Sequence, residues 1–323
     1  MASLYLNLNG IPTDVPSAET VYFYHDPQGV WRRSKGDRSG EFDILCVRLH
    51  DALRKRIMNG IPYEKIIYAL PQFVQTAGLN SEGGGDVMQF EQLLSKFKDF
   101  PHLNAFLYLY DCESLVASLQ ECNKEVDHLL GEFYKSLNTE PLFFPVMQQP
   151  DGIRWNTSPT VTKLFAHLSF IFVRLHSLLD YATKVVLEVE RLRSEFRKYP
   201  KLASANVLFG DRKKLAMNGA KGTLFEACEL VTAVETLRNR VIHDGLLDDM
   251  PKAYEHIEGG NAVERFILLP DMTAGRFDRF NNRNLFFGQD DKINLRLPIL
   301  IDDFQSRLEA TIVTLLAKFD HAG

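Results

Sequence analysis

Hydrophobic residues recur every three or four positions along several long stretches of the chain, and this spacing predicts amphipathic helices. The stretches cover residues 102–137, 159–197, 223–245 and 300–319. Because apolar faces of this length are buried against one another in a folded protein, the pattern predicts a helical bundle.

The stretch at 159–197 carries the strongest pattern. Ser158 stands where an N-cap residue is expected, and Pro159 suits the first helical position. The apolar stripe consists of Leu164, Leu168, Phe172, Leu175, Leu179, Ala182, Val185, Val189, Leu192 and Phe196. This stripe predicts one continuous helix of roughly nine turns.

Residues 1–40 show the alternating pattern of short strands instead. The sequence D-P-Q-G at 26–29 is a turn signal between two aromatic runs, which predicts a small hairpin. Helical spacing returns at Glu41, and a second helix through YEKIIYAL is limited by Pro71.

The Gly-rich stretch at 79–86 is the best candidate for a linker. Directly after it, Asp86 and Gln89 have the spacing of a capping box at the start of a short helix. We therefore divide the chain into an N-terminal α+β accessory region at 1–85 and a helical bundle at 86–323.

Residues 250–297 lack helical spacing and contain two strand-like pieces, ERFILL and INLRLP. The expected fold class is therefore mainly α, with the accessory region before the bundle and a short strand-containing insert before the last helix.

The composition is that of an ordinary globular protein, with 45% hydrophobic and 24% charged residues. The net charge of −5 means that nucleic acid could be attracted only by a local basic patch. The segment from Lys184 to Lys214 has nine basic and four acidic residues, although the same charges also suit a solvated helix end and loop. The candidate phosphate-contacting residues are Arg197, Lys198, Arg212, Lys213 and Lys214.

The cysteines stand singly in apolar segments, which predicts reduced, buried thiols rather than a zinc site. They are Cys46, Cys112, Cys122 and Cys228. We expect no metal and no cofactor. The most apolar stretch is interrupted by His167, Arg174 and His176, and the N-terminus lacks a basic leader. No membrane association and a cytoplasmic location are therefore expected.

The sequence TLRNRVIHDGLLDD at 236–249 places several polar residues at a helix end. A structural interpretation is available, because basic side chains are favourable near a helix C-terminus and Gly245 is a natural residue after it. Arg240 and Asp244 also have the spacing of a surface ion pair.

A functional interpretation starts from Asn239 and His243, which lie four residues apart and share a helix face. Arg238 and His243 are separated by about 140° and about 7.5 Å along a regular α-helix, so no direct contact is expected. Only the reach of the arginine, or a second copy of this helix end, would bring both groups to one substrate.

The motif R-N-R-V-I-H resembles the R-x4-6-H motif of the HEPN superfamily, and its place on the penultimate helix of the expected bundle strengthens the resemblance. The resemblance implies a metal-independent endoribonuclease, often a toxin or antiviral defence effector, with a site built by two protomers. Arg238 and His243 would be the catalytic pair, and Asn239 would position them. The products would carry a 2′,3′-cyclic phosphate and a 5′-hydroxyl.

The implied partners are RNA, a second copy of the chain and an antitoxin or regulatory protein. Some related toxins are silenced by AMP transfer to a tyrosine two positions after the histidine, and here that position is Gly245. An alternative is a catalytically inactive HEPN-like bundle that binds RNA or a protein.

Overall fold

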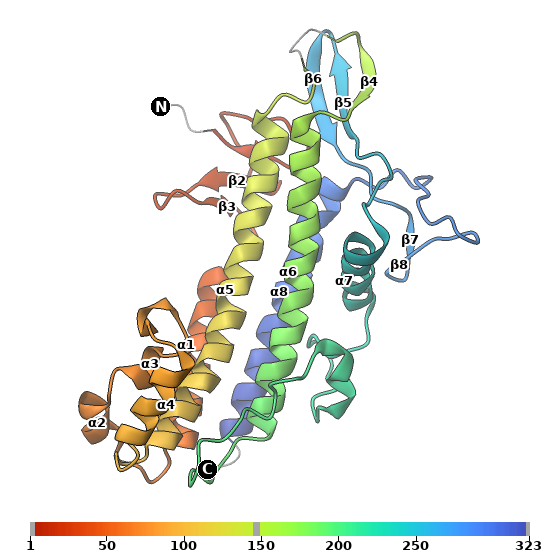
Figure 1. Cartoon of the computed structure of the whole chain (residues 1–323). Helices are drawn as coiled ribbons and strands as arrows, with labels where there is room; N and C mark the ends of the chain where they lie inside the picture. Colours follow the sequence, from red (N-terminus) through yellow and green to blue (C-terminus); the bar gives the residue numbers. More distant parts are fainter. Residues whose placement is uncertain (1–3, 145–148, 321–323) are drawn as a thin grey trace. The chain divides into compact units, whose positions relative to one another are not determined.

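The computed structural model describes residues 4–144 and 149–320 and confirms a mainly α chain with small antiparallel sheets (Figure 1). Internal contacts divide the chain into two compact units. Unit 1 contains Met1–Gly40, Cys122–Ser177 and Ala227–Arg307, and unit 2 contains Glu41–Glu121, Leu178–Glu226 and Leu308–Gly323. Both units combine segments from either side of residue 85, and the boundary expected there stays a prediction. Residues 145–148, in the loop expected before residue 159, lie outside the described part.

The long helices α5 (Leu103–Thr139), α6 (Pro159–Glu190) and α8 (Ile293–Asp320) contribute residues to both units. The stripe of α6 is buried from Leu164 to Val185, as its spacing predicts, but the helix ends at Glu190 and not at 197 as expected. The helix begins at Pro159 as expected, but the Ser158 hydroxyl is buried without a hydrogen-bond partner and does not cap it.

The last helix begins earlier than its pattern suggested, because INLRLP forms its first turns rather than a strand. Ile293, Leu297 and Ile301 are buried at a spacing of four residues, whereas Leu295 is exposed. The buried residues of this segment therefore follow a helical period. The alternation of apolar and polar residues, which suggested a strand, was misleading. Pro298 lies inside the helix, where its missing N–H costs one backbone hydrogen bond.

Unit 1 holds the sheets. The N-terminal sheet has the order β1 (Leu6–Asn7), β2 (Tyr22–His25), β3 (Trp31–Arg33). The second sheet has the order β4 (Gly152–Asn156), β5 (Ala253–Glu258), β6 (Asn261–Phe266). A further hairpin pairs β7 (Met272–Thr273) with β8 (Arg276–Phe277). The hairpin expected around residues 26–29 is confirmed, and ERFILL enters β6 with its first three residues.

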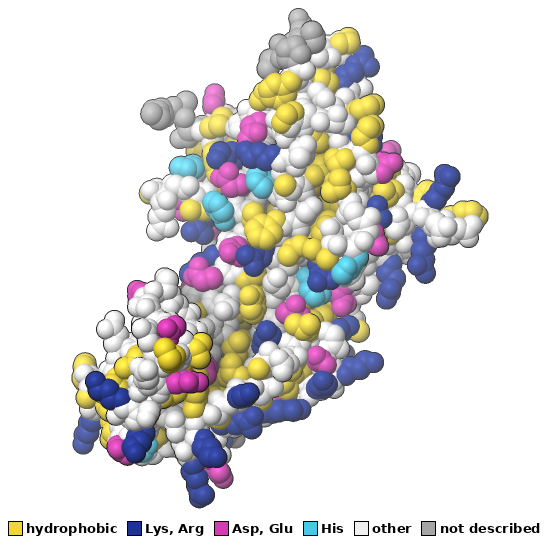
Figure 2. Space-filling model, viewed as in Figure 1, with side chains coloured by type: hydrophobic (Ala, Val, Ile, Leu, Met, Phe, Trp, Pro, Cys, Tyr) yellow, Lys and Arg dark blue, Asp and Glu magenta, His cyan; other side chains and the backbone are white. Residues whose placement is uncertain are grey.

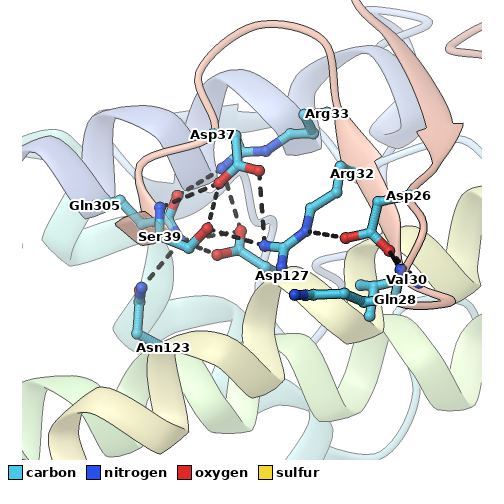
Figure 3. A network of polar contacts seen from close by, with 10 residues as sticks. All are labelled: Asp26, Gln28, Val30, Arg32, Arg33, Asp37, Ser39, Asn123, Asp127 and Gln305. Carbon is cyan, nitrogen blue, oxygen red and sulfur yellow. Dashed lines mark hydrogen bonds and ion pairs between the residues drawn. The ribbon is translucent and has the colours of Figure 1, made fainter. Parts of the chain in front are cut away.

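A buried polar network ties the N-terminal hairpin of unit 1 to its helices (Figure 3). The Arg33 guanidinium donates to Asp127 Oδ1 at 3.2 Å and to Gln305 Oε1 at 2.6 Å. The Gln305 amide donates in turn to Asn123 Oδ1 and to Asp127, each at 3.1 Å. Burial raises the pKa of Asp127, and the charge of Arg33 opposes that shift.

Unit 2 is helical. It contains most of α1 (Ser39–Ile57), then α2 (Tyr63–Ile66), η1 (Ile67–Ala69), α3 (Phe73–Thr76), η2 (Ser81–Gly83), α4 (Val87–Lys96) and η3 (Phe209–Lys214). The expected capping box is confirmed, since Asp86 accepts from the Gln89 N–H at 2.7 Å and Gln89 Oε1 accepts from the Asp86 N–H at 3.0 Å. This reciprocal pair fixes where α4 begins.

The described cysteines carry no disulfide, and burial is confirmed for Cys46, Cys112 and Cys122 while Cys228 is half-buried. Within residues 4–144 and 149–320, no helix combines the length and apolar character that crossing a bilayer requires.

Candidate active site

The motif lies in unit 1, at the end of α7 (Glu229–Asn239) and in the π-helical turn η4 (Arg240–Asp244) that continues it (Figure 1). The helix was expected from residue 223 and begins at Glu229 instead. Val231, Val234 and Leu237 are buried along one face of α7. This apolar face anchors the helix and leaves its last turn at the surface.

A close approach of the β7–β8 hairpin also holds α7 in unit 1. Gly275, in the turn of that hairpin, has a φ of +76°, and a Cβ placed there would lie 2.4 Å from the Glu229 carbonyl oxygen and 2.8 Å from the Ala233 nitrogen. Only glycine satisfies both the backbone conformation and the tight contact at this turn. The hairpin therefore packs its backbone directly on the first turns of the motif helix.

Arg238 and His243 are in direct contact. Arg238 Nη1 lies 3.2 Å from His243 Nε2 and donates to Asn239 Oδ1 at 2.9 Å. The expectation that the arginine and histidine of one chain would not touch was wrong, because it assumed a regular α-helix up to residue 245. The π-helical turn winds the chain more widely, so that residues five apart approach the same face.

The contact suits one role of the ring. Because a guanidinium carries only donors, the contact is a hydrogen bond when His243 Nε2 is the accepting nitrogen. His243 and Asn239 are exposed and Arg238 is half-buried, so a solvent-borne substrate can reach all three. The motif thus presents a cation, a proton-accepting nitrogen and an amide together.

Arg240 and Gly245 shape the loop that follows. Arg240 Nε donates to the Leu246 carbonyl oxygen at 2.8 Å, and its Nη1 lies 3.5 Å from Asn284 Oδ1. Gly245 has a φ of +106°, which favours glycine and ends the helix as expected. The second arginine of R-N-R therefore binds the backbone of the chain. Its carbonyl partner could not be read from the sequence, because it depends on the turn of the loop.

The candidate phosphate-contacting residues belong to unit 2. Arg197 and Lys198 are exposed in the segment after α6, and Lys and Arg side chains gather over this segment in Figure 2. Arg212 stacks on the Phe209 ring, with its Cζ 4.2 Å from the ring centroid. Lys213 is exposed, and Lys214 forms an ion pair with Asp211 at 2.6 Å.

Among the described residues, no group of three or more His, Cys, Asp or Glu side chains comes together in a way that could hold a metal ion. Comparison with protein-family models, with curated proteins and with solved structures finds no match for this chain.

Proposed function

We propose that the protein is a metal-independent endoribonuclease of HEPN type that acts as a toxin or antiviral defence effector. The contact between Arg238 and His243 at an exposed helix end carries this proposal. Asn239 lies in the same cluster and orients the guanidinium through its side-chain oxygen.

The chemistry suits these residue types. In the proposed step His243 Nε2 leaves its contact with Arg238 and takes the proton of an RNA 2′-hydroxyl, and the 2′-oxygen then attacks the adjacent phosphorus. The bond from phosphorus to the 5′-oxygen breaks, and the leaving oxygen takes a proton from a protonated imidazole. Arg238 holds two phosphoryl oxygens while negative charge builds on them. The products are a 2′,3′-cyclic phosphate and a 5′-hydroxyl.

A homodimer would supply the second imidazole, because one histidine cannot be base and acid in the same step. Exposed apolar side chains beside the motif support self-association in the proposal. Ile242, Leu246 and Met250 are 49%, 44% and 46% exposed. A contiguous apolar surface formed by them would suit a protein partner, either a second copy or an antitoxin or regulatory partner.

Unit 2 would supply RNA contacts of its own, since phosphate neutralisation by cationic side chains supplies much of the affinity for nucleic acid. Arg197, Lys198, Arg212, Lys213 and Lys214 are the proposed contacts, and the accessibility of Arg197, Lys198 and Lys213 supports them best. Arg212 already stacks on the Phe209 ring, and Lys214 already pairs with Asp211, so RNA would compete with these contacts.

The test is cleavage of single-stranded RNA by the purified full chain in EDTA, with the termini of the products identified. We expect His243→Ala to lower the rate at least about 100-fold, as the loss of a general base does. His128→Ala, which removes an exposed histidine of α5, is the matched control and should cleave normally. RNA with 2′-deoxy sugars should be resistant.

Cleavage that survives His243→Ala, or that stops in EDTA, contradicts the proposal. Binding of RNA without cleavage in any condition favours the inactive binding module instead.

A further inference from the structure

A cavity of about 590 Å³ lies in unit 2, beside the end of α6. Its volume falls within the range of sites for small organic ligands, roughly 300–1,000 Å³. It is formed by residues of α1, of the end of α6 with the segment after it, and of the end of α8. The motif residues do not line it.

The cavity combines positive charge with one compensated carboxylate. Among the described residues that line it, the cationic ones are Arg56, Arg193 and Lys318, and the acidic one is Glu190. Glu190 accepts from the backbone N–H groups of Ala216 and Met217 at 2.8 and 3.0 Å and from Lys318 Nζ at 2.7 Å. Its charge is therefore satisfied within the protein, and the described lining carries three cationic side chains against this one carboxylate, which favours an anion.

A buried hydrogen-bond chain fixes the backbone of the cavity at Arg193. The Arg193 N–H donates to Tyr108 Oη at 3.2 Å, and the Tyr108 hydroxyl donates to Glu188. The other carboxylate oxygen of Glu188 accepts from the N–H and the hydroxyl of Ser204 at 2.9 and 2.8 Å. The wall that carries the Arg193 guanidinium is thus set in place before any ligand arrives, which lowers the entropy cost of binding.

The apolar wall is formed by the end of α6 and the segment after it. Val189, Leu192 and Phe196 are the last members of the expected apolar stripe, and all three line the cavity and are half-buried rather than buried. Phe196 contacts the Tyr108 ring, with 5.8 Å between centroids, so its ring is held by the same core that fixes Arg193. Phe196 thus offers the cavity an aromatic face for a planar group, and Arg193 offers a guanidinium fork for a phosphate.

We infer that this cavity binds a nucleoside monophosphate, with the phosphate held by Arg193 and the base against Phe196. This site is separate from the Arg238–His243 motif and does not rest on RNA cleavage.

The experiment is isothermal titration calorimetry on the full chain with adenosine and uridine 5′-monophosphates. The parent nucleosides and inorganic phosphate serve as separate titrants. We expect the monophosphates to bind at least about tenfold more tightly than the parent nucleosides or inorganic phosphate. Arg193→Gln should weaken binding about tenfold, as the loss of a charge-assisted hydrogen bond does. Arg56→Gln tests the cationic lining residue that α1 contributes.

Arg191→Gln is the matched control, because Arg191 is exposed two residues before Arg193 and does not line the cavity. It should bind normally, as should Arg238→Gln. The inference would be overturned if inorganic phosphate bound as tightly as the monophosphates. It would also be overturned if Arg193→Gln left the affinity unchanged, or if millimolar nucleotide gave no heat. Loss of binding in Arg238→Gln would assign the nucleotide to the motif instead.

Discussion

The guanidinium of Arg238 and the imidazole of His243 meet within one chain, with 3.2 Å between Nη1 and Nε2. Pairing of these two groups therefore does not require a second copy. In the proposed mechanism the partner copy supplies only the second imidazole. The need for the Arg238–His243 contact and the need for a dimer can therefore be tested separately.

Arg238→Lys keeps the charge but replaces a planar fork with a single ammonium. We expect RNA cleavage to fall about 10- to 100-fold in kcat/KM, because the lysine cannot hold two phosphoryl oxygens together. The free energy of unfolding should not change measurably, since the contact is exposed. Arg283→Lys, at an exposed arginine outside the motif, is the control. An equal loss in both variants would argue against a specific role for Arg238.

Gly275→Ala should loosen the packing of the β7–β8 hairpin on α7. The added methyl group meets the Glu229 carbonyl oxygen at 2.4 Å in a backbone with positive φ, so we expect a loss of about 2 kcal/mol or more in urea unfolding. Gly29→Ala tests the conformational part alone, because Gly29 has a φ of +88° with open space around it. It should cost only about 1 kcal/mol. Similar losses in the two variants would contradict the close approach.

Tyr108→Phe removes a hydroxyl that connects two buried groups, Glu188 and the Arg193 N–H. We expect a loss of roughly 2 kcal/mol in the free energy of unfolding, because a buried carboxylate loses one of its donors. Tyr199→Phe is the comparison, because the Tyr199 hydroxyl donates to Asp111 at an exposed position. That loss should stay below about 1 kcal/mol, since water replaces the donor. Chemical denaturation of both variants at one pH decides the comparison.

Stability should fall as pH rises through the titration of Glu113. Burial raises the pKa of Glu113 from 4.5 to about 7, with Arg54 opposing the shift and Asp51 adding to it. Between these values the folded state binds more protons than the unfolded state, so the free energy of unfolding decreases with rising pH and levels off above about 7. Glu113→Gln should be neutral at pH 4 and stabilising by on the order of 2 kcal/mol at pH 8.

Urea unfolding of wild type and Glu113→Gln at both pH values measures this difference. Glu91→Gln, at an exposed glutamate of α4, serves as the comparison and should show no change in pH dependence of this size. A constant gap between wild type and Glu113→Gln would exclude Glu113 as the titrating group.

The sequence predicts the helical parts of the fold well, because the stripe from Leu164 to Val185 repeats with one period over many turns. It predicts β4 and β5 poorly, since their pairing joins segments about a hundred residues apart and the letters of GIRWN carry no clear alternation. For the candidate site, the residue types were evident from the sequence. The contact between Arg238 and His243 was not, because a π-helical turn leaves no period in so short a piece.

The Arg33–Asp127 pair gives the N-terminal segment a role in folding. Asp127 on α5 and Gln305 on α8 are separated by nearly 180 residues in the sequence. Both accept a hydrogen bond from Arg33 in the same buried network. A chain shortened past residue 33 would leave a carboxylate in a poorly hydrated place without its counter-ion, which costs several kcal/mol. The first forty residues therefore contribute to the stability of this unit, whose native contacts join positions as distant as 33 and 305. Contacts of such long sequence separation slow folding.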